Sequence, residues 1–218
     1  MAGCCNSIAR CLLILFNILF WLSGAALLGL GIWFKVDKNI NSYLDVIEVD
    51  TEDPYFDYAV YVLIAFGAFV FLVGFCGCCG AVRESKCLLG FYIFFLMIII
   101  GGEIAAAVFG FLYKDKVETK VTDLLMETME KYKTSKNVRN AWDFVQIELD
   151  CCGSDSPETW KNLSITYYYN AQGCKDGLKD LIMEYNWIIF GVAIGIAFLE
   201  VIGIVFAFCV CREINKDD

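Results

Sequence analysis

The chain has 218 residues, of which 59% are hydrophobic and only 20% are charged. Soluble domains carry less apolar sequence, so this composition predicts a membrane protein. The formal charge of −9 argues against nucleic acid as a partner, and the absence of His removes the commonest acid–base group and metal ligand, so the composition does not favour an enzyme.

Four apolar runs are long enough to cross a lipid bilayer. They cover residues 11–34, 58–82, 88–113 and 187–210. Aromatic residues suited to a membrane interface stand at the ends that we expect to be extracellular: Trp33, Tyr58, Tyr113 and Trp187. The first run is too long for a signal peptide and lacks a cleavage pattern, so we interpret it as a membrane anchor. The segments left outside the membrane are 1–10, 35–57, 83–87, 114–186 and 211–218.

The charges beside these runs predict the orientation of the chain. Arg10 precedes the first run, Arg212 follows the last, and the turn 83–87 carries two basic residues against one acid, whereas the loop 35–57 is mainly acidic. Short basic flanks stay in the cytosol. We therefore expect cytosolic termini and an extracellular segment 114–186.

Small residues form two regular rows in the first two runs. They recur every seven positions, as Asn17, Gly24 and Gly31 in the first run and as Gly67, Gly74 and Ala81 in the second. Small residues let helix backbones approach closely, so we expect these two helices to pack together. The alternative is that Gly is simply common in membrane helices.

Three polar side chains lie inside the predicted spans: Asn17, Glu103 and Glu200. A carboxylate is costly in the bilayer, and neither Glu has a cation at its depth. We expect both to be largely protonated, to face the bundle interior, and to donate a hydrogen bond to Asn17 or to a backbone carbonyl. The cluster is interpreted either as the polar floor of a cavity for cholesterol or another lipid, or as hydrogen bonding between helices. A proton relay is less favoured because no further titratable groups continue the path.

The segment 114–186 has the pattern of three short amphipathic helices. Apolar stripes run over 117–129, 138–149 and 178–185, and Ser135 is a candidate N-cap for the second helix. Three stripes can enclose one small core. A domain of this size also needs a covalent staple.

The staple is predicted at Cys151-Cys152-Gly153. Adjacent Cys residues do not pair comfortably with each other, and Cys174 is the remaining Cys of this segment. Three Cys can form one disulfide and leave one thiol, and the residues alone leave the pairing open. Gly153 would let the backbone turn sharply after the second helix.

An aromatic excursion, residues 159–172, lies between these cysteines. It contains Trp160, Ile165, Tyr167, Tyr168 and Tyr169. We interpret it as a surface for recognising a partner protein, and the alternative is that these side chains cap the small core. Asn162-Leu163-Ser164 is an N-glycosylation sequon, so Asn162 is a candidate glycan site.

Over its whole length the chain resembles a tetraspanin. The residues that carry the resemblance are Asn17, Gly77-Cys78-Cys79-Gly80-Ala81 with Arg83-Glu84-Ser85, Glu103-Ile104-Ala105-Ala106-Ala107, Cys151-Cys152-Gly153, and Cys174 before the last span. The implied fold class is that of an all-α membrane protein with four transmembrane helices and a small, mainly helical, disulfide-stapled large extracellular loop.

The resemblance also implies a disulfide pairing. In tetraspanins the first Cys of the Cys-Cys-Gly motif pairs with the last Cys of the loop, which implies Cys151–Cys174 here. The second Cys usually pairs with a Cys in the excursion, and this chain lacks that residue. Cys152 is therefore expected to be unpaired or to pair between chains.

Tetraspanins commonly carry palmitate on juxtamembrane Cys. The candidates are Cys4, Cys5, Cys11, Cys78, Cys79, Cys87, Cys209 and Cys211. Cys76 lies deeper and is a poorer candidate. A zinc site built from Cys76, Cys78, Cys79 and Cys87 is possible by count but not favoured.

The leading functional interpretation is a non-enzymatic scaffold of the plasma membrane or endosomal membranes. It would organise receptors, adhesion proteins, other tetraspanins and membrane lipids into microdomains, and self-association into a homo-oligomer is left open. The alternatives are a small four-span channel or transporter, for which the spans hold few polar groups, and a claudin-like junction protein, whose disulfide-bearing loop is the first one. No cofactor is expected apart from bound lipid and covalent palmitate.

Overall fold

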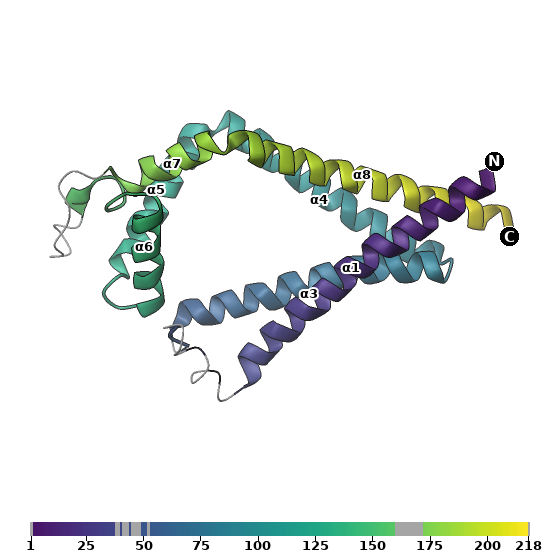
Figure 1. Ribbon diagram of the computed structural model, residues 1–218, viewed down its shortest axis with the longest axis horizontal. Helices are drawn as coiled ribbons and strands as arrows, with labels where there is room; N and C mark the ends of the chain where they lie inside the picture. The colour runs from purple at the N-terminus through teal and green to yellow at the C-terminus, as the bar shows by residue number, and fades with distance from the viewer. Residues whose placement is uncertain are drawn as a thin grey trace. The chain divides into compact units, whose positions relative to one another are not determined.

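The computed structural model describes residues 2–37, 40, 44, 49–51, 53–159 and 172–217, with side chains for all of these except 2–6, 216 and 217. The described part contains the helices α1 (Ala2–Val36), α3 (Pro54–Val82), α4 (Lys86–Leu112), α5 (Lys114–Glu130), α6 (Lys136–Glu148), α7 (Cys174–Glu184) and α8 (Asn186–Asp217) (Figure 1). Its only extended pairing is an isolated bridge between Cys151 and Gln172. The predicted fold class, four membrane helices with a disulfide-stapled helical loop, is confirmed.

Four of these helices are long and apolar enough to cross a membrane. The candidate spans are Ser7–Val36, Pro54–Val82, Lys86–Leu112 and Asn186–Asn215. Helix α8 continues past Val210, where the predicted membrane span ends, since a helix can extend beyond the apolar stretch that crosses the bilayer. Helix α4 instead stops at Leu112, and α5 begins at Lys114.

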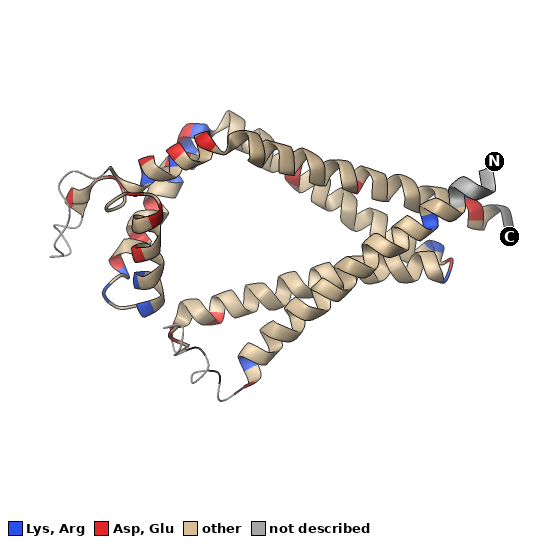
Figure 2. Ribbon diagram, in the orientation of Figure 1, with Lys and Arg blue, Asp and Glu red and all other residues tan. Residues whose placement is uncertain are grey.

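The chain divides into two compact units. The membrane unit comprises residues 1–38, 57–106 and 193–218, and the loop unit comprises residues 39–56 and 107–192. Charged residues gather on α5, α6 and α7, whereas the four long helices carry few (Figure 2). This distribution matches two different surroundings, lipid for the long helices and water for the short ones.

The core of the membrane unit draws on all four long helices. Its buried residues are Leu13, Val73, Cys76, Ala81, Leu89, Tyr92, Leu96, Ala207 and Val210. Helices α1 and α3 approach especially closely: a Cβ added to Gly24 would lie 2.3 Å from the backbone N of Phe71, and one added to Gly74 would lie 2.5 Å from the backbone N of Trp21. The close packing predicted from the two rows of small residues is therefore confirmed.

Arg10 of α1 binds the turn between α3 and α4. Its Nη1 lies 2.5 Å from Oε1 of Glu84, and its Nη2 donates a 3.2 Å hydrogen bond to the carbonyl of Val82. Glu84 has a φ of 53°, in the left-handed region that side chains other than Gly rarely adopt. Arg10 thus holds the turn between α3 and α4 in place, although an exposed ion pair adds little stability by itself.

The loop unit encloses a second core between α5, α6 and α7. Its buried residues are Met129, Val138, Trp142, Cys151, Cys152 and Cys174. Ser135 caps α6 as predicted, because its Oγ accepts a 3.0 Å hydrogen bond from the backbone N of Val138.

Candidate functional sites

Asn17 is the first member of a polar cluster inside the membrane unit. It belongs to α1 and is only 2% exposed. Its Nδ2 donates a 2.8 Å hydrogen bond to the carbonyl of Leu13, four residues earlier in the same helix. A Cβ added to Gly77 of α3 would lie 2.3 Å from Oδ1 of Asn17, so the glycine makes room for this amide between the helices.

Tyr92 of α4 extends the polar cluster. The residue is buried, and its hydroxyl interacts with the side chain of Asn17. The same hydroxyl lies against α8, where a Cβ added to Gly203 would be 2.6 Å from it. One phenol therefore contacts two other helices. Tyr92 was not among the residues predicted for this cluster, although a phenol in an otherwise apolar span needs a polar partner and is a signal for that reason.

Glu200 of α8 is the unsatisfied member of the polar cluster. It is 9% exposed, and its Oε2 has no hydrogen-bond partner in the described part of the chain. It interacts electrostatically with Tyr92 and with Glu103 of α4, which is half-buried. Asn17 and a backbone carbonyl were the two acceptors expected for a Glu, and no bond from a Glu to Asn17 occurs among the described residues; the Asn17 amide donates instead to the carbonyl of Leu13. The polar cluster thus consists of Asn17, Tyr92 and Glu200, with Glu103 at its edge.

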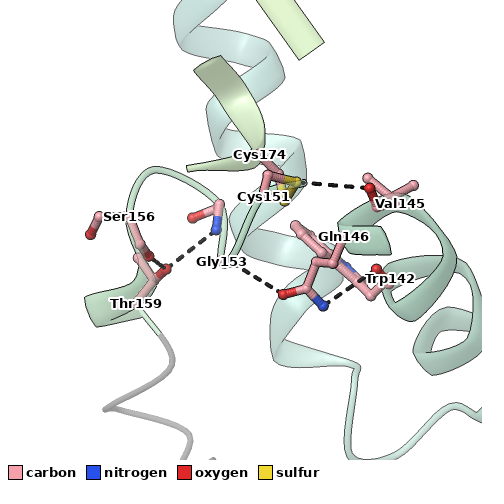
Figure 3. The surroundings of a disulfide bond; sticks show 9 residues. Trp142, Val145, Gln146, Cys151, Gly153, Ser156, Thr159 and Cys174 are labelled. Carbon is pink, nitrogen blue, oxygen red and sulfur yellow. Dashed lines mark hydrogen bonds between the residues drawn. A yellow bond between two sulfur atoms is a disulfide. The ribbon is translucent and has the colours of Figure 1, made fainter. Parts of the chain in front are cut away.

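The staple of the loop unit joins Cys151 to Cys174, the pairing that the resemblance implies (Figure 3). The two Cα atoms are 4.9 Å apart. Backbone hydrogen bonds reinforce the staple: the N–H of Cys152 donates to the carbonyl of Gln172 at 2.8 Å, and the N–H of Cys174 donates to the carbonyl of Gly153 at 2.9 Å. The chain segments that enter and leave the excursion are therefore fixed side by side.

Gly153 makes the sharp turn that the sequence predicted. Its φ is 74°, and an added Cβ would lie 2.3 Å from the carbonyl oxygen of Ser156. Its N–H donates to Oε1 of Gln146 at 3.3 Å, and Nε2 of Gln146 donates to the carbonyl of Trp142 at 3.3 Å (Figure 3). Gln146 therefore connects the turn to α6.

Cys152 carries a free thiol. It is 8% exposed and packs in the core of the loop unit with Met129 and Trp142. This position favours the unpaired alternative, since a buried sulfur is out of reach of a cysteine from a second chain.

A hydrogen-bonded clasp holds the turn between α5 and α6. The hydroxyl of Tyr132 donates to Oδ1 of Asp143 at 2.7 Å, and Nε of Arg139 donates to the carbonyl of Tyr132 at 3.3 Å. Burial of the phenol, together with its bond to the Asp143 carboxylate, raises the pKa of Tyr132 to about 12.

A shallow acidic groove of about 400 Å³ lies where α5 faces the start of α7. Nζ of Lys175 is 3.0 Å from Oδ1 of Asp155 and 3.8 Å from Oε1 of Glu118. The hydrogen bond to Asp155 raises the pKa of Lys175. No group of three Cys, Asp or Glu that could hold a metal occurs among the residues described.

The remaining predicted sites divide by whether the structure describes them. Trp160, Asn162, Ile165, Tyr167, Tyr168 and Tyr169 lie outside the described residues, as do the side chains of Cys4 and Cys5. Among the other acylation candidates, Cys11 and Cys87 are exposed, Cys79, Cys209 and Cys211 are half-buried, and Cys78 is buried.

Four apolar helices around a buried polar cluster, with a disulfide-stapled helical loop, define a multi-pass membrane protein. The model of the Tetraspanin family matches residues 9–213. The chain belongs to the tetraspanin family.

Curated relatives support the assignment. The chain is 35% identical to the CD9 antigen of Chlorocebus aethiops over 209 residues, which cover 93% of this chain and 91% of the relative. It is 29% identical to the CD82 antigen of Rattus norvegicus over 263 aligned positions, covering 100% and 97% of the two chains. It is 33% identical to Tetraspanin-2 of Rattus norvegicus over 206 residues, covering 94% and 92%.

Proposed function

We propose that this protein is a non-enzymatic scaffold that organises other membrane proteins and lipids into microdomains. The observation that carries the proposal is the uncovered apolar surface of α4 and α8. Large exposed side chains on these helices include Phe91, Phe94, Ile98, Ile194, Phe198 and Val205. Lipid tails are as apolar as these side chains, so such faces suit lateral contact both with lipid and with the spans of other proteins.

We place both termini in the cytosol and the loop unit outside the cell or in the lumen of an endosome. The basic residues Arg10, Arg83 and Arg212 beside the spans support this orientation. The aromatic excursion then faces receptors, adhesion proteins or other tetraspanins, and Asn162 is accessible for a glycan.

Palmitate would strengthen lateral association. Exposure ranks the candidate cysteines: Cys11 and Cys87 are open to an acyltransferase, whereas Cys78 is 7% exposed and packed inside the membrane unit. We propose acylation at the exposed pair before the half-buried cysteines.

A sterol hydroxyl is the ligand that we propose for the polar cluster. The support is the buried Oε2 of Glu200, an oxygen without a partner in the described part of the chain. Photo-crosslinking with a sterol probe should fall in Glu200→Ala and stay unchanged in the control Glu213→Ala, which alters the far end of the same helix. Equal labelling of both variants and the wild type would remove the sterol proposal.

Proximity labelling in intact cells tests the scaffold proposal. A labelling enzyme fused to the N-terminus is compared between the wild type, a variant with residues 160–171 replaced by a Gly-Ser linker, and Cys11→Ser/Cys87→Ser. We expect the linker variant to lose neighbours that have large ectodomains and the Cys variant to lose other tetraspanins. If all three chains label the same set, the protein does not organise partners through these features.

A further inference from the structure

The first loop of the loop unit is joined to α6 by a chain of buried hydrogen bonds that begins at Asp53. Oδ1 of Asp53 accepts a 3.0 Å hydrogen bond from the backbone N of Tyr55, which caps the start of α3. Oδ2 of the same carboxylate accepts the hydroxyl hydrogen of Ser135. Asp53 and Ser135 are 6% and 7% exposed, so both groups have been withdrawn from water.

Ser135 links this carboxylate to a second helix. While its hydroxyl donates to Asp53, its Oγ also accepts the 3.0 Å bond from Val138 that caps α6. One carboxylate therefore caps α3 and orients the cap of α6. Removing the side chain of Asp53 or of Ser135 leaves the other buried polar group without its hydrogen bond. The desolvation cost of that group then destabilises the starts of both α3 and α6.

Asn137 makes a second connection between the same two segments. Its Oδ1 accepts a 2.7 Å hydrogen bond from the backbone N of Asp50, and its Nδ2 donates a 2.6 Å bond to the carbonyl of Asp50. A side-chain amide that bonds both backbone groups of one residue acts like a neighbouring strand. The Asn137 side chain therefore fixes both the position of the first loop along α6 and the distance between the loop and the helix.

These contacts define one wall of an apolar groove. The groove has a volume of about 330 Å³ and is lined by Tyr55, Leu125, Thr128, Asn137, Val138, Ala141, Trp142 and Val145. Tyr55 lies two residues after Asp53, and Asn137 belongs to the groove itself. The hydrogen bonds of Asp53 and Asn137 therefore hold Tyr55 in the lining of the groove, to which the buried Trp142 also belongs.

We propose that Asp53, Ser135 and Asn137 form a latch that locks the first loop to the large loop, so that the two move as one body, and that releasing the latch opens the groove between α5 and α6. The latch bonds are long-range in sequence, since their partners lie 82 and 87 positions apart. The latch is a property of the loop unit alone and does not depend on the scaffold proposal.

Hydrogen–deuterium exchange on the full chain in detergent micelles tests the latch. In Ser135→Ala, we expect the backbone amides of Tyr55 and Asp50 to exchange about tenfold faster, together with that of Val138. Ser135→Thr keeps both a cap and a hydroxyl donor and should exchange like the wild type. The control Thr134→Ala removes a neighbouring exposed hydroxyl that, within the described part of the chain, bonds the carbonyl of Lys131, and it should change nothing in the first loop.

A purely local cap predicts a different result. If Ser135→Ala speeds exchange only at the start of α6 and leaves residues 49–56 unchanged, the latch is refuted. Should Ser135→Ala fail to fold, Asn137→Ala carries the same test, because it leaves both helix caps intact. It should speed exchange at Tyr55 as well as at Asp50, and a change confined to Asp50 would contradict coupling.

Opening of the groove between α5 and α6 can be measured separately by thiol labelling. Thr128→Cys places a thiol in the groove wall, and its maleimide labelling can be resolved from that of the other cysteines by peptide mass spectrometry. We expect labelling to be severalfold faster when Asn137→Ala is added and unchanged when Thr134→Ala is added. Equal rates in all three backgrounds would show that the latch does not control the groove.

Discussion

The substitution Gly24→Ala tests most directly how the membrane unit is held together. The new Cβ would lie 2.3 Å from the backbone N of Phe71 and 2.7 Å from its Cα. Both are backbone atoms of α3, so no side-chain rotation can relieve the contact. Because atoms of this kind normally stay about 3.5 Å apart, α1 and α3 must separate locally by roughly 1 Å.

The expected cost comes from overpacking. Adding a methylene to a well-packed core typically destabilises a protein by about 1–3 kcal/mol. The higher helix propensity of Ala offsets up to about 1 kcal/mol of this. A net loss of about 1 kcal/mol lowers Tm by about 2–4 °C in a chain of this size.

Gly29→Ala is the matched control in the same helix, because a Cβ at Gly29 meets nothing within 4 Å. Thermal unfolding of both variants in the same detergent should show a lower Tm for Gly24→Ala and an unchanged or slightly higher one for Gly29→Ala. Gly74→Ala should resemble Gly24→Ala, and the double variant should lose less than the sum, since both open one interface. A Tm loss in Gly24→Ala no larger than in Gly29→Ala would refute the close packing of α1 on α3.

Tyr92→Phe keeps the ring but removes the hydroxyl that meets Asn17, so it should lower stability by about 1 kcal/mol in the same thermal assay, and an unchanged Tm would contradict the role of that hydroxyl. The pKa of Tyr132 is about 12 in the folded loop unit against about 10 in an unfolded chain, so the unfolded state releases this proton first. Stability should therefore fall as pH rises from about 10 to 12, and Tyr132→Phe should remove that part of the fall when unfolding is followed by circular dichroism. Cys174→Ser opens the bridge to Cys151, which closes a sequence separation of 23, and should cost about 3 kcal/mol. A reductant should destabilise the wild type by the same amount and leave the variant unchanged.

The four membrane spans and the packing of α1 on α3 could be predicted from the sequence, because both follow from patterns that are local in the chain. Apolar length alone identifies the four membrane helices. Small residues that recur every seven positions, such as Gly24 in α1 and Gly74 in α3, predict the contact between these two helices. Gly153 in the left-handed region likewise follows from a single residue type at a turn. The pairing of Cys151 with Cys174 required the family resemblance, because three cysteines leave the choice open.

The polar contacts were not predictable in this way, because they depend on which segments meet and in which register. Tyr92 reaches Asn17 across 75 positions of sequence, and no local pattern encodes that meeting. Of the two acceptors expected for a protonated Glu, Asn17 receives no bond from a Glu among the described residues, and the Asn17 amide itself donates to the Leu13 carbonyl one helical turn away. The choice between a local and a distant partner favours the local one wherever geometry allows it.

These polar contacts also explain how an apolar chain adopts one arrangement. In a bilayer, burying a Leu or Phe against another helix gains little over burying it in lipid, so the apolar faces of α4 and α8 do not by themselves select a neighbour. Selection inside the bundle falls to the close approach at the glycines of α1 and α3 and to the interaction of the Tyr92 hydroxyl with Asn17. A scaffold of the proposed kind needs this division. A few close-fitting groups determine how the helices of its interior are arranged. Its outer apolar faces can contact varied partners. Specificity toward those partners must then come from the loop unit.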